Sequence, residues 1–313
     1  PSLVYLTRLM MQKKYRTIHL AGWGNLNCLY LMFLSRFTSL SLSVGSDTQL
    51  HKTIPKWKQL IKYWGYQRML YPLLFKLPTM FLPGGTRQQK YLEHYGVSKE
   101  KIVLSQMTVD ITALKESILK ITSEKKLALR RERHVQDTEI VFLYVGRLLD
   151  WKGIFELVEA FKQINNVRAK LWIVGDGPLE EYVQESAQNI SGICYFGRTD
   201  GSQLVNIYHA ADVFVLPSHA EPWGLVVNEA MVAGNAIIIS EDAGCVDDLV
   251  LHEETGLLVP PKDVNALAAA MEYLASDDEA REKLAKQAKQ HIAPWTLENQ
   301  ASNFVSAWSR EAV

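Results

Sequence analysis

Short apolar runs alternate with helical stretches through the second half of the chain, and this alternation restricts the possible folds more than any other feature. Each run consists almost entirely of apolar and β-branched residues, and each is followed by a loop and a segment with helical periodicity. Strands that are apolar along their whole length are typical of parallel sheets covered by helices on both faces. The sequence therefore predicts a doubly wound α/β domain with strands at residues 139–145, 169–174, 193–196, 213–216 and 236–239.

The first half of the chain predicts a smaller sheet of the same kind. Short strands are expected at residues 17–21, 40–44, 79–82 and 101–104, with helices between them. This is fewer than the roughly five to six strands of a usual sheet, and no Gly-rich turn follows a first strand. We therefore expect this half to lack an N-terminal portion, with removal of an initiator Met before Pro1 as the alternative.

The two halves differ sharply in charge. Up to His134 there are 22 Lys and Arg against 7 Asp and Glu, a balance of +15, whereas the remainder has 12 against 27, a balance of −15. The positive half predicts an anionic partner, and attraction between the two halves is the alternative explanation. We predict an N-terminal domain at 1–134 that ends in a polar connecting helix over 111–134, a C-terminal domain at 135–293, and a helix at 294–313 that packs back on the N-terminal domain.

Composition excludes several classes of protein. A hydrophobic content of 48% with 22% charged residues excludes wholesale disorder. The three cysteines, Cys28, Cys194 and Cys245, are too few and too scattered for a disulfide framework or a C-x-x-C metal site, which favours a reducing compartment. The first residues carry no signal-peptide pattern. Polar residues interrupt the apolar window at 26–44, so a buried helix and strand are expected there rather than a membrane span.

The stretch from Pro217 to Met231 is the most informative for function. The predicted strand ends at Leu216, a loop carries Glu221 and Gly224, and a helix begins near Gly224 with Glu229 in its second turn. A helix that starts at such a loop directs backbone N–H groups and the positive end of its dipole toward a ligand. Carboxylates accept hydrogen bonds only, so Glu221 and Glu229 suit sugar hydroxyls. The alternative is that both are solvated surface charges.

A second candidate site follows the first strand of the same domain. Gly146 would allow a sharp turn at the carboxyl end of that strand, which is where α/β domains bind ligands. Arg147 and Lys152 bring two cations to this place. An Arg fork and a Lys point charge together suit a diphosphate, and the alternative is a surface salt bridge.

These stretches together resemble the retaining nucleotide-sugar glycosyltransferases of the GT-B fold, in the bacterial family-four group (glycosyl transferases group 1). The resemblance covers nearly all of residues 140–275 and extends more weakly upstream over Gly84–Asp110. It implies two Rossmann-like doubly wound domains that face a cleft. The matching motifs are Val145-Gly-Arg-Leu148 with Lys152-Gly153, Ile173-Val-Gly-Asp-Gly-Pro178, Phe196-Gly-Arg198, Ala211-Asp-Val-Phe-Val-Leu-Pro-Ser218, the E-x₇-E pair from Glu221 to Glu229, and Gly256-Leu-Leu-Val259.

The resemblance also implies a role for each matching residue. Arg147 and Lys152 would bind the donor diphosphate and stabilise the leaving group, while Glu221 would hold the transferred sugar; these three are the expected catalytic residues. Glu229 would accept from the ribose hydroxyls. The family needs neither a metal nor another cofactor, and it retains the anomeric configuration by front-face attack. The remaining expected donor-binding residues are Gly146, Gly175, Phe196, Gly197, Arg198, Trp223, Gly224 and Leu225.

The first half departs from the family pattern. The Gly-rich loop after the family's first strand has no counterpart, and the usual donor-facing His has none either. His19 lies inside an expected strand, where a core role and a functional role are both open, and Ser46-Asp47 occupies the loop where such a group is expected. The donor half therefore looks complete, whereas the acceptor half does not.

Basic and aromatic residues are interleaved from Lys52 to Lys76. This pattern suits an interfacial helix on an anionic membrane, and a helix that buries its aromatic residues in the core is the alternative. No RNP or KH signature is present, so nucleic acid is not expected as a partner. We expect a cytoplasmic glycosyltransferase, peripheral on the inner face of the membrane, with a glycan or lipid-linked acceptor. The alternatives are a sugar-nucleotide epimerase or phosphorylase of the same fold, and a non-catalytic sugar-nucleotide-binding subunit.

Overall fold

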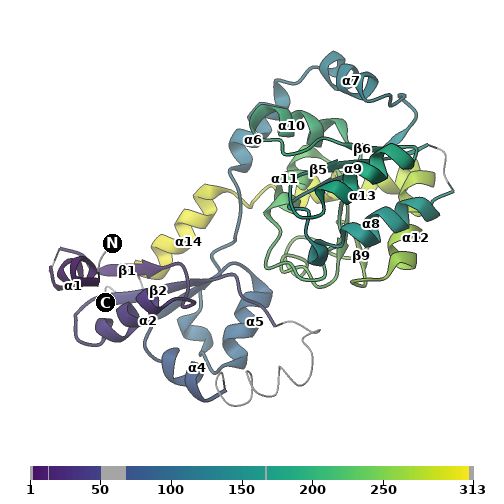
Figure 1. The fold of residues 1–313 in the computed structure, drawn as a ribbon. Helices are drawn as coiled ribbons and strands as arrows, with labels where there is room; N and C mark the ends of the chain where they lie inside the picture. The colour runs from purple at the N-terminus through teal and green to yellow at the C-terminus, as the bar shows by residue number, and fades with distance from the viewer. Residues whose placement is uncertain (1–2, 13, 51–67, 166–167, 310–313) are drawn as a thin grey trace. The chain divides into compact units, whose positions relative to one another are not determined.

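The computed structural model describes residues 3–12, 14–50, 68–165 and 168–309 (Figure 1). The chain forms two compact units. The first contains residues up to 107 together with those from 298 onward, and the second contains residues 108–297. None of the described helices combines the length and the apolar character needed to cross a lipid bilayer.

The first unit is built on a three-stranded parallel sheet with the order β1-β2-β3. Its register pairs Thr17 with Ser41 and Val44 with Phe81. The elements are α1 Leu3–Met11, β1 Thr17–Leu20, α2 Leu26–Ser35, β2 Ser41–Ser46, α4 Arg68–Leu74, β3 Met80–Pro83, α5 Thr86–His94 and α14 Leu297–Ser309.

The strand expected at residues 101–104 is wrong. Lys99–Lys101 instead form a 3-10 helix, which is closed by a 3.0 Å hydrogen bond from the Ile102 N–H to the Lys99 carbonyl. Ile102 then makes a single parallel bridge with Phe81. The 3-10 helix takes only Lys101 of the expected range. The Val103 and Ser105 N–H groups donate to the Phe81 and Pro83 carbonyls over 3.0 and 2.8 Å, so the segment runs along β3 but forms one bridge rather than a strand.

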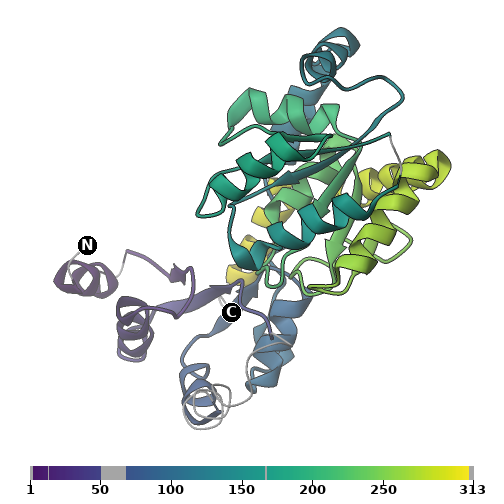
Figure 2. The same cartoon turned by 45° about the vertical axis from the view of Figure 1, so that its right-hand side comes forward.

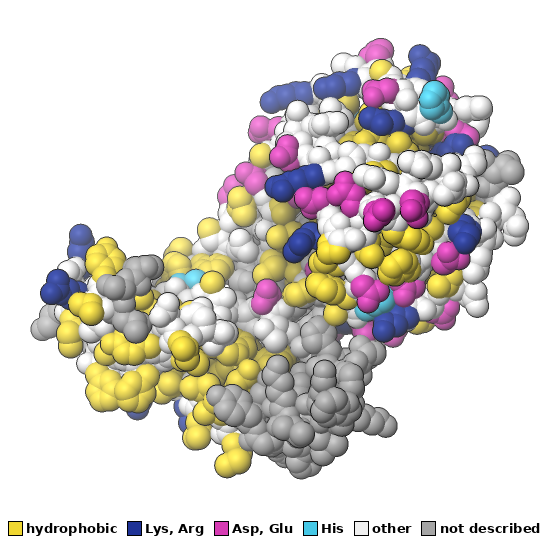
Figure 3. Space-filling model, viewed as in Figure 1, with side chains coloured by type: hydrophobic (Ala, Val, Ile, Leu, Met, Phe, Trp, Pro, Cys, Tyr) yellow, Lys and Arg dark blue, Asp and Glu magenta, His cyan; other side chains and the backbone are white. Residues whose placement is uncertain are grey.

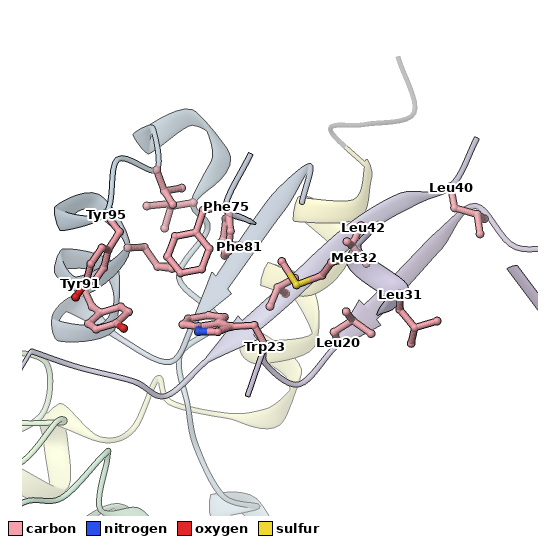
Figure 4. Packing of buried hydrophobic residues seen from close by; sticks show 14 of the residues in the cluster. Leu20, Trp23, Leu31, Met32, Leu40, Leu42, Phe75, Phe81, Tyr91 and Tyr95 are labelled. Carbon is pink, nitrogen blue, oxygen red and sulfur yellow. The ribbon is translucent and has the colours of Figure 1, made fainter. Parts of the chain in front are cut away.

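An aromatic cluster forms much of the first unit's core. Figure 4 shows Trp23 with the aromatic side chains, including Phe75 and Tyr91, on one side of it and aliphatic side chains on the other. The Trp23 and Phe75 ring centroids lie 4.8 Å apart. Phe75 belongs to the basic–aromatic stretch from Lys52 to Lys76. Its burial in this cluster confirms, for this residue, the alternative that the stretch packs its aromatic side chains in the core. Residues 51–67 of that stretch lie outside the described residues.

Helix α14 packs on the sheet of the first unit, although it lies more than 200 residues further along the chain than the last strand of that sheet. Ala307 is fully buried in a cluster with Met80 and Leu82. The Trp308 indole N–H donates to the Ser43 hydroxyl over 2.9 Å. The sheet of the first unit therefore depends on the last described helix of the chain.

The second unit contains a six-stranded parallel sheet with the order β6-β5-β4-β7-β8-β9, which confirms the doubly wound α/β prediction. Figure 2 shows this sheet with helices on both sides. Every residue of β4, β7 and β8 is buried, which explains their continuous apolar sequences. The strands are β4 Ile140–Val145, β5 Ala169–Val174, β6 Ile193–Tyr195, β7 Val213–Leu216, β8 Ala236–Ser240 and β9 Leu257–Val259; the helices are α6 Ile111–Leu119, α7 Ser123–Glu132, α8 Ile154–Gln163, α9 Glu180–Asn189, α10 Gly201–Ala210, α11 Leu225–Ala233, α12 Val264–Ser276 and α13 Asp278–His291, with a 3-10 helix at Asp150–Lys152.

The expected connecting helix over 111–134 is two helices, α6 and α7, and both belong to the second unit. The Thr122 hydroxyl accepts from the Lys125 N–H and caps the start of α7. Arg130 is buried near the end of α7, where it pairs with Asp212 at 3.0 Å and donates to the Ala210 carbonyl at 2.9 Å. These contacts attach α7 to the second unit, and the two units consequently divide after Met107 rather than at residue 134.

Candidate functional site

The order of the second sheet reverses between β4 and β7, and the loops that leave these two strands lie against each other. The Trp151 carbonyl accepts from the His219 N–H over 2.8 Å. Gly153 has φ of +74°, and a Cβ there would lie 2.3 Å from the Pro217 carbonyl oxygen, so only glycine allows this approach. Ligands of doubly wound domains bind at such a reversal, outside the carboxyl ends of the strands.

Lys152 and Glu221, one from each loop, form an ion pair between Nζ and Oε2. Their side chains are 19% and 10% exposed, so the pair is shielded but still open to solvent. The Glu221 carbonyl accepts from the Gly244 N–H at 2.8 Å, which fixes the backbone of its loop. The structure thus brings together two residues that are 69 positions apart in the sequence, and it places opposite charges where a charged ligand could separate them.

Arg147 is the first exposed residue after β4. Its guanidinium makes no hydrogen bond or ion pair with another residue of the described ranges, so it has its donors available for an anion. The backbone around it is fixed, because the buried Tyr144 hydroxyl donates to the Arg147 carbonyl at 2.9 Å. Gly146 fits the close turn beside this hydroxyl, since a Cβ there would lie 2.9 Å from the Tyr144 oxygen.

Helix α11 begins at the end of the other loop. Its N-cap is Gly224 in the left-handed region, with φ of +99°, and no side-chain hydrogen bond caps this end. The side chain of Trp223 is buried, where its indole N–H donates to the Asn228 side chain over 3.1 Å. Only the backbone of Trp223 therefore remains for a ligand, whereas Leu225 is exposed at the first turn. An uncapped helix N-terminus favours a negatively charged group.

Glu229 lies in the second turn of α11 and is held by a residue that the sequence did not indicate. The Tyr208 hydroxyl, on α10, donates to Glu229 Oε2 over 2.8 Å. Burial raises the pKa of the Glu229 carboxyl, and the hydrogen bond from Tyr208 acts in the opposite direction. Tyr208 is itself buried, and burial raises its pKa as well, so its hydroxyl stays protonated and able to donate.

The loops after β5 and β6 adjoin the β4 loop. A Cβ on Gly175, which has φ of +143°, would lie 1.8 Å from the Gly146 carbonyl oxygen. The Gly175 N–H donates to the Gly197 carbonyl at 2.9 Å, and the Gly175 carbonyl accepts from the Tyr195 hydroxyl at 2.9 Å. Burial is the main reason that the pKa of Tyr195 is raised to about 12. Gly146, Gly175 and Gly197, three of the predicted donor-binding residues, therefore lie together at the carboxyl ends of β4, β5 and β6.

Phe196 and Arg198 are placed differently from these glycines. The Phe196 ring packs edge-on against Trp172, with centroids 5.2 Å apart, and the Arg133 guanidinium lies 4.5 Å from its centre. The ring thus serves packing, and the backbone is the part of Phe196 that is left to contact a ligand. Arg198 is well exposed and lies 3.7 Å from the Asp176 carboxylate.

A separate cavity of about 630 Å³ lies in the first unit, at the carboxyl ends of β1 and β2. The loop over residues 21–25 and the loop over 45–48, which includes Ser46 and Asp47, line it together with Tyr71 and Tyr91. Aromatic walls with a few polar groups are typical of small-molecule sites. His19 does not line this cavity; its ring packs on Phe304 of α14 with centroids 5.2 Å apart, and burial lowers its pKa.

Residues 108–291 match the model of the family described as glycosyl transferases group 1. The chain is 32% identical over 195 residues to an uncharacterized glycosyltransferase of Methanocaldococcus jannaschii, an alignment that covers 61% of this chain and 50% of that protein. It is 26% identical over 241 residues, covering 77% of this chain and 63% of that protein, to the N,N'-diacetylbacillosaminyl-diphospho-undecaprenol alpha-1,3-N-acetylgalactosaminyltransferase of Campylobacter jejuni.

Solved structures agree with these sequence matches. An Anabaena protein crystallised in complex with UDP superimposes with a TM-score of 0.80 at 18% identity, over 98% of this chain and 82% of that one. This likeness confirms the predicted GT-B-like α/β fold. The chain spans half of the length of its Methanocaldococcus relative and less than two thirds of its Campylobacter relative.

Proposed function

Because the chain belongs to the family of glycosyl transferases group 1, we propose that it transfers a hexosyl group from a nucleotide-diphosphate sugar to a glycan or lipid-linked acceptor, with retention of the anomeric configuration. The observation that carries this proposal is the convergence, at the reversal of the second sheet, of Arg147, the Lys152–Glu221 pair and the uncapped start of α11. Two cations and a helix N-terminus are suited to a diphosphate. The carboxylates beside them are suited to sugar hydroxyls.

Donor binding is proposed to open the Lys152–Glu221 pair. Lys152 Nζ would turn to the diphosphate beside the Arg147 guanidinium, and the freed Glu221 carboxylate would accept from hydroxyls of the transferred sugar. Glu229, which Tyr208 positions, would accept from the ribose. Neither charged group is left without a partner, because Lys152 exchanges the carboxylate for the diphosphate while Glu221 exchanges the ammonium for hydrogen bonds from sugar hydroxyls. This limits the desolvation cost that leaving either charge unpaired would bring.

The transfer step follows from this arrangement. The bond between the anomeric carbon and the diphosphate oxygen breaks, and its electron pair leaves on the diphosphate. Arg147 and Lys152 stabilise the charge that develops there. The acceptor oxygen bonds to the anomeric carbon from the same face, and its proton passes to a diphosphate oxygen. This proton transfer removes the need for a separate general base in the second unit.

The acceptor is proposed to bind at the cavity of the first unit, where Trp23 and Tyr91 offer aromatic surface and Asp47 offers a carboxylate. The Campylobacter relative is named for a diphospho-undecaprenol acceptor, which supports a lipid-linked glycan here. The reaction would then belong to glycan assembly at the cytoplasmic side of a membrane. Several hydroxyl-bearing acceptors fit this chemistry, so the function test uses a panel of them.

The test is acceptor-dependent release of nucleoside diphosphate from a panel of nucleotide-diphosphate sugars, with product configuration determined by NMR. Transfer with retention supports the proposal, and transfer with inversion contradicts its stereochemistry. Donor binding with no transfer to any acceptor would favour the non-catalytic binding subunit. Epimerisation of the donor without acceptor, or phosphorolysis of a glycan, would favour the epimerase or phosphorylase.

Metal independence is a prediction of the same proposal. Among the described residues no three His, Cys, Asp or Glu side chains are grouped so as to hold a metal ion. The cations Arg147 and Lys152 would neutralise the diphosphate instead. We expect EDTA to leave donor binding and transfer within about twofold of the untreated protein, a change of under half a kcal/mol. Loss of transfer that Mg²⁺ or Mn²⁺ restores would contradict this prediction.

A further inference from the structure

Glu156, in the first turn of α8, meets the loop that carries Glu221. Glu156 Oε1 lies 2.9 Å from Nε2 of His219, which is ion-pair distance, and the two side chains are 18% and 13% exposed. Acidic side chains are spread over the visible surface of the second unit (Figure 3), whereas this carboxylate is shielded. Its second oxygen, Oε2, is buried and makes no hydrogen bond with any described residue. His219 therefore compensates a negative charge that has little access to water.

This contact and the Lys152–Glu221 pair join the same two segments of the second unit. Lys152 and Glu156 lie four residues apart, on either side of the start of α8, and His219 and Glu221 lie two residues apart in the loop after β7. The His219 backbone is fixed as well, because its N–H donates to the Trp151 carbonyl. The loop after β7 is thus attached to the loop after β4 and its helix by two pairs of charged side chains.

The two pairs differ in what donor binding is proposed to do to them. Lys152 and Glu221 each exchange the other for a part of the donor, so their attachment of the two segments is lost when the donor binds. His219 and Glu156 are not among the proposed donor ligands, and their contact can stay closed. Without it, the loop would be held by packing and by neutral backbone hydrogen bonds, such as the one from the Gly244 N–H to the Glu221 carbonyl.

We propose that His219 and Glu156 are positioning residues, whose contact holds Glu221 in place for the transferred sugar while the Lys152–Glu221 pair is open. Because Glu221 is assigned to the sugar only by the proposed function, this role rests on that function. Arg147 and Lys152 are proposed to meet the diphosphate, and both belong to the segment after β4, whereas Glu221 belongs to the loop that His219 holds. Loss of the contact is therefore expected to weaken binding of the sugar moiety and to spare the diphosphate.

The experiment compares nucleotide-diphosphate sugars with the matching nucleoside diphosphates by isothermal titration calorimetry of the full chain. The probes are UDP-glucose, UDP-N-acetylgalactosamine and GDP-mannose, each measured beside UDP or GDP. In His219→Ala we expect the affinity for the sugar donor to fall about tenfold, the effect of losing one contact with a charged group. The affinity for the nucleoside diphosphate should change by less than about twofold. Equal weakening of both would indicate a general loss of structure and overturn the positioning role.

Further variants connect the effect to this contact. Glu156→Ala should repeat the effect of His219→Ala, and His219→Gln, which keeps an N–H group for the carboxylate, should recover most of the affinity. Glu159→Ala is the matched control, because its carboxylate lies on the next turn of the same helix and is 49% exposed; it should change the affinity by less than about twofold. In a Glu221→Ala background, His219→Ala should have no further effect on the sugar donor, since it acts through Glu221.

Amide hydrogen exchange without any donor tests the contact itself. We expect residues 217–224 to exchange about tenfold faster in His219→Ala and in Glu156→Ala, while β4 and β7 stay as protected as in the wild type. Thermal unfolding establishes which variants remain folded, and Glu156→Ala provides the same test if His219→Ala does not fold. Unchanged exchange of this loop, or a full additional loss of sugar affinity when His219→Ala is combined with Glu221→Ala, would overturn the proposal. A wild-type chain that binds none of the three sugar donors would contradict the proposed function, and the exchange data would still decide whether His219 and Glu156 hold the loop.

Discussion

Tyr208 donates a hydrogen bond to the carboxylate that is proposed to hold the donor ribose. In Tyr208→Phe the burial that raises the pKa of Glu229 acts without the opposing hydrogen bond. The folded-state pKa then rises further, so the carboxylate takes up a proton at a higher pH as the solution is acidified. We expect the KM for the donor to increase on the acid side at a higher pH than in the wild type, with kcat at high pH little changed.

The measurement is the pH dependence of the donor KM between about pH 5 and 8, the range over which a raised carboxyl pKa becomes visible. Tyr273→Phe, an exposed tyrosine on α12, is the matched control. A merely structural role of Tyr208 would alter KM equally at every pH, and that outcome contradicts the positioning role.

Arg147 is the second residue with a specific expected effect. Its guanidinium has no partner among the described residues, so Arg147→Ala removes a ligand contact without breaking an internal ion pair. One charge-assisted contact contributes about 1.5–3 kcal/mol, or roughly a ten- to hundredfold weakening of donor binding. Isothermal titration with the nucleoside diphosphate measures this effect, and Lys162→Ala, an exposed cation on α8, is the control. Unchanged affinity in Arg147→Ala would remove the diphosphate assignment.

At the scale of elements, the loop after β5 packs closely against the loop after β4, and Gly175 is the residue at the point of contact. Gly175→Ala would bring a methyl group to 1.8 Å from the Gly146 carbonyl oxygen. Because backbone atoms must then move, we expect a loss of about 2 kcal/mol or more in the free energy of unfolding, together with weaker donor binding. Urea denaturation of the full chain provides the measurement.

The control for this substitution separates a steric clash from an unfavourable φ. Gly96 also has a positive φ, of +85°, but a Cβ there would meet nothing within 4 Å. Gly96→Ala should therefore cost only the left-handed strain of about 1 kcal/mol. If both variants lose the same stability, close packing between the two loops is not what requires glycine at 175.

The strands of the second unit could be predicted from sequence because one property, burial on both sides, makes them apolar throughout. The break between α6 and α7 was missed because the segment is polar on either side of it, although Thr122 is a usual N-cap residue. Lys152 and Glu221 could each be identified from the sequence as candidate site residues. Their ion pair could not, because it depends on β4 and β7 being neighbours in the sheet. Tyr208 belongs to no motif, and only the contact between α10 and α11 reveals it.

At the scale of the whole molecule, α14 returns the C-terminal end of the described chain to the unit that the N-terminal end forms. Ala307 is fully buried against Met80 and Leu82, so Ala307→Glu would bury an unpaired carboxylate. We expect a loss of about 3 kcal/mol or more, confined to the first unit. Hydrogen exchange should show faster opening of β1, β2 and β3 and unchanged protection of β4 to β9.

Ala301→Glu on the same helix is the matched control, since residue 301 is exposed. A surface substitution of this kind should stay within about 0.5 kcal/mol of the wild type. If Ala307→Glu instead accelerates exchange in both units alike, the stability of the second unit depends on the first, contrary to the expectation.

The interruption of the first unit by the second also has a consequence for the order of events during translation. The strands of the first unit leave the ribosome early, but the helix that covers Met80 and Leu82 is synthesised about 200 residues later. At about 5–20 residues per second this delay is roughly 10–40 s. The second unit can fold as soon as residue 297 has emerged, while the first still has apolar sheet surface exposed. A nascent chain stalled before α14 is therefore expected to be a client for chaperones.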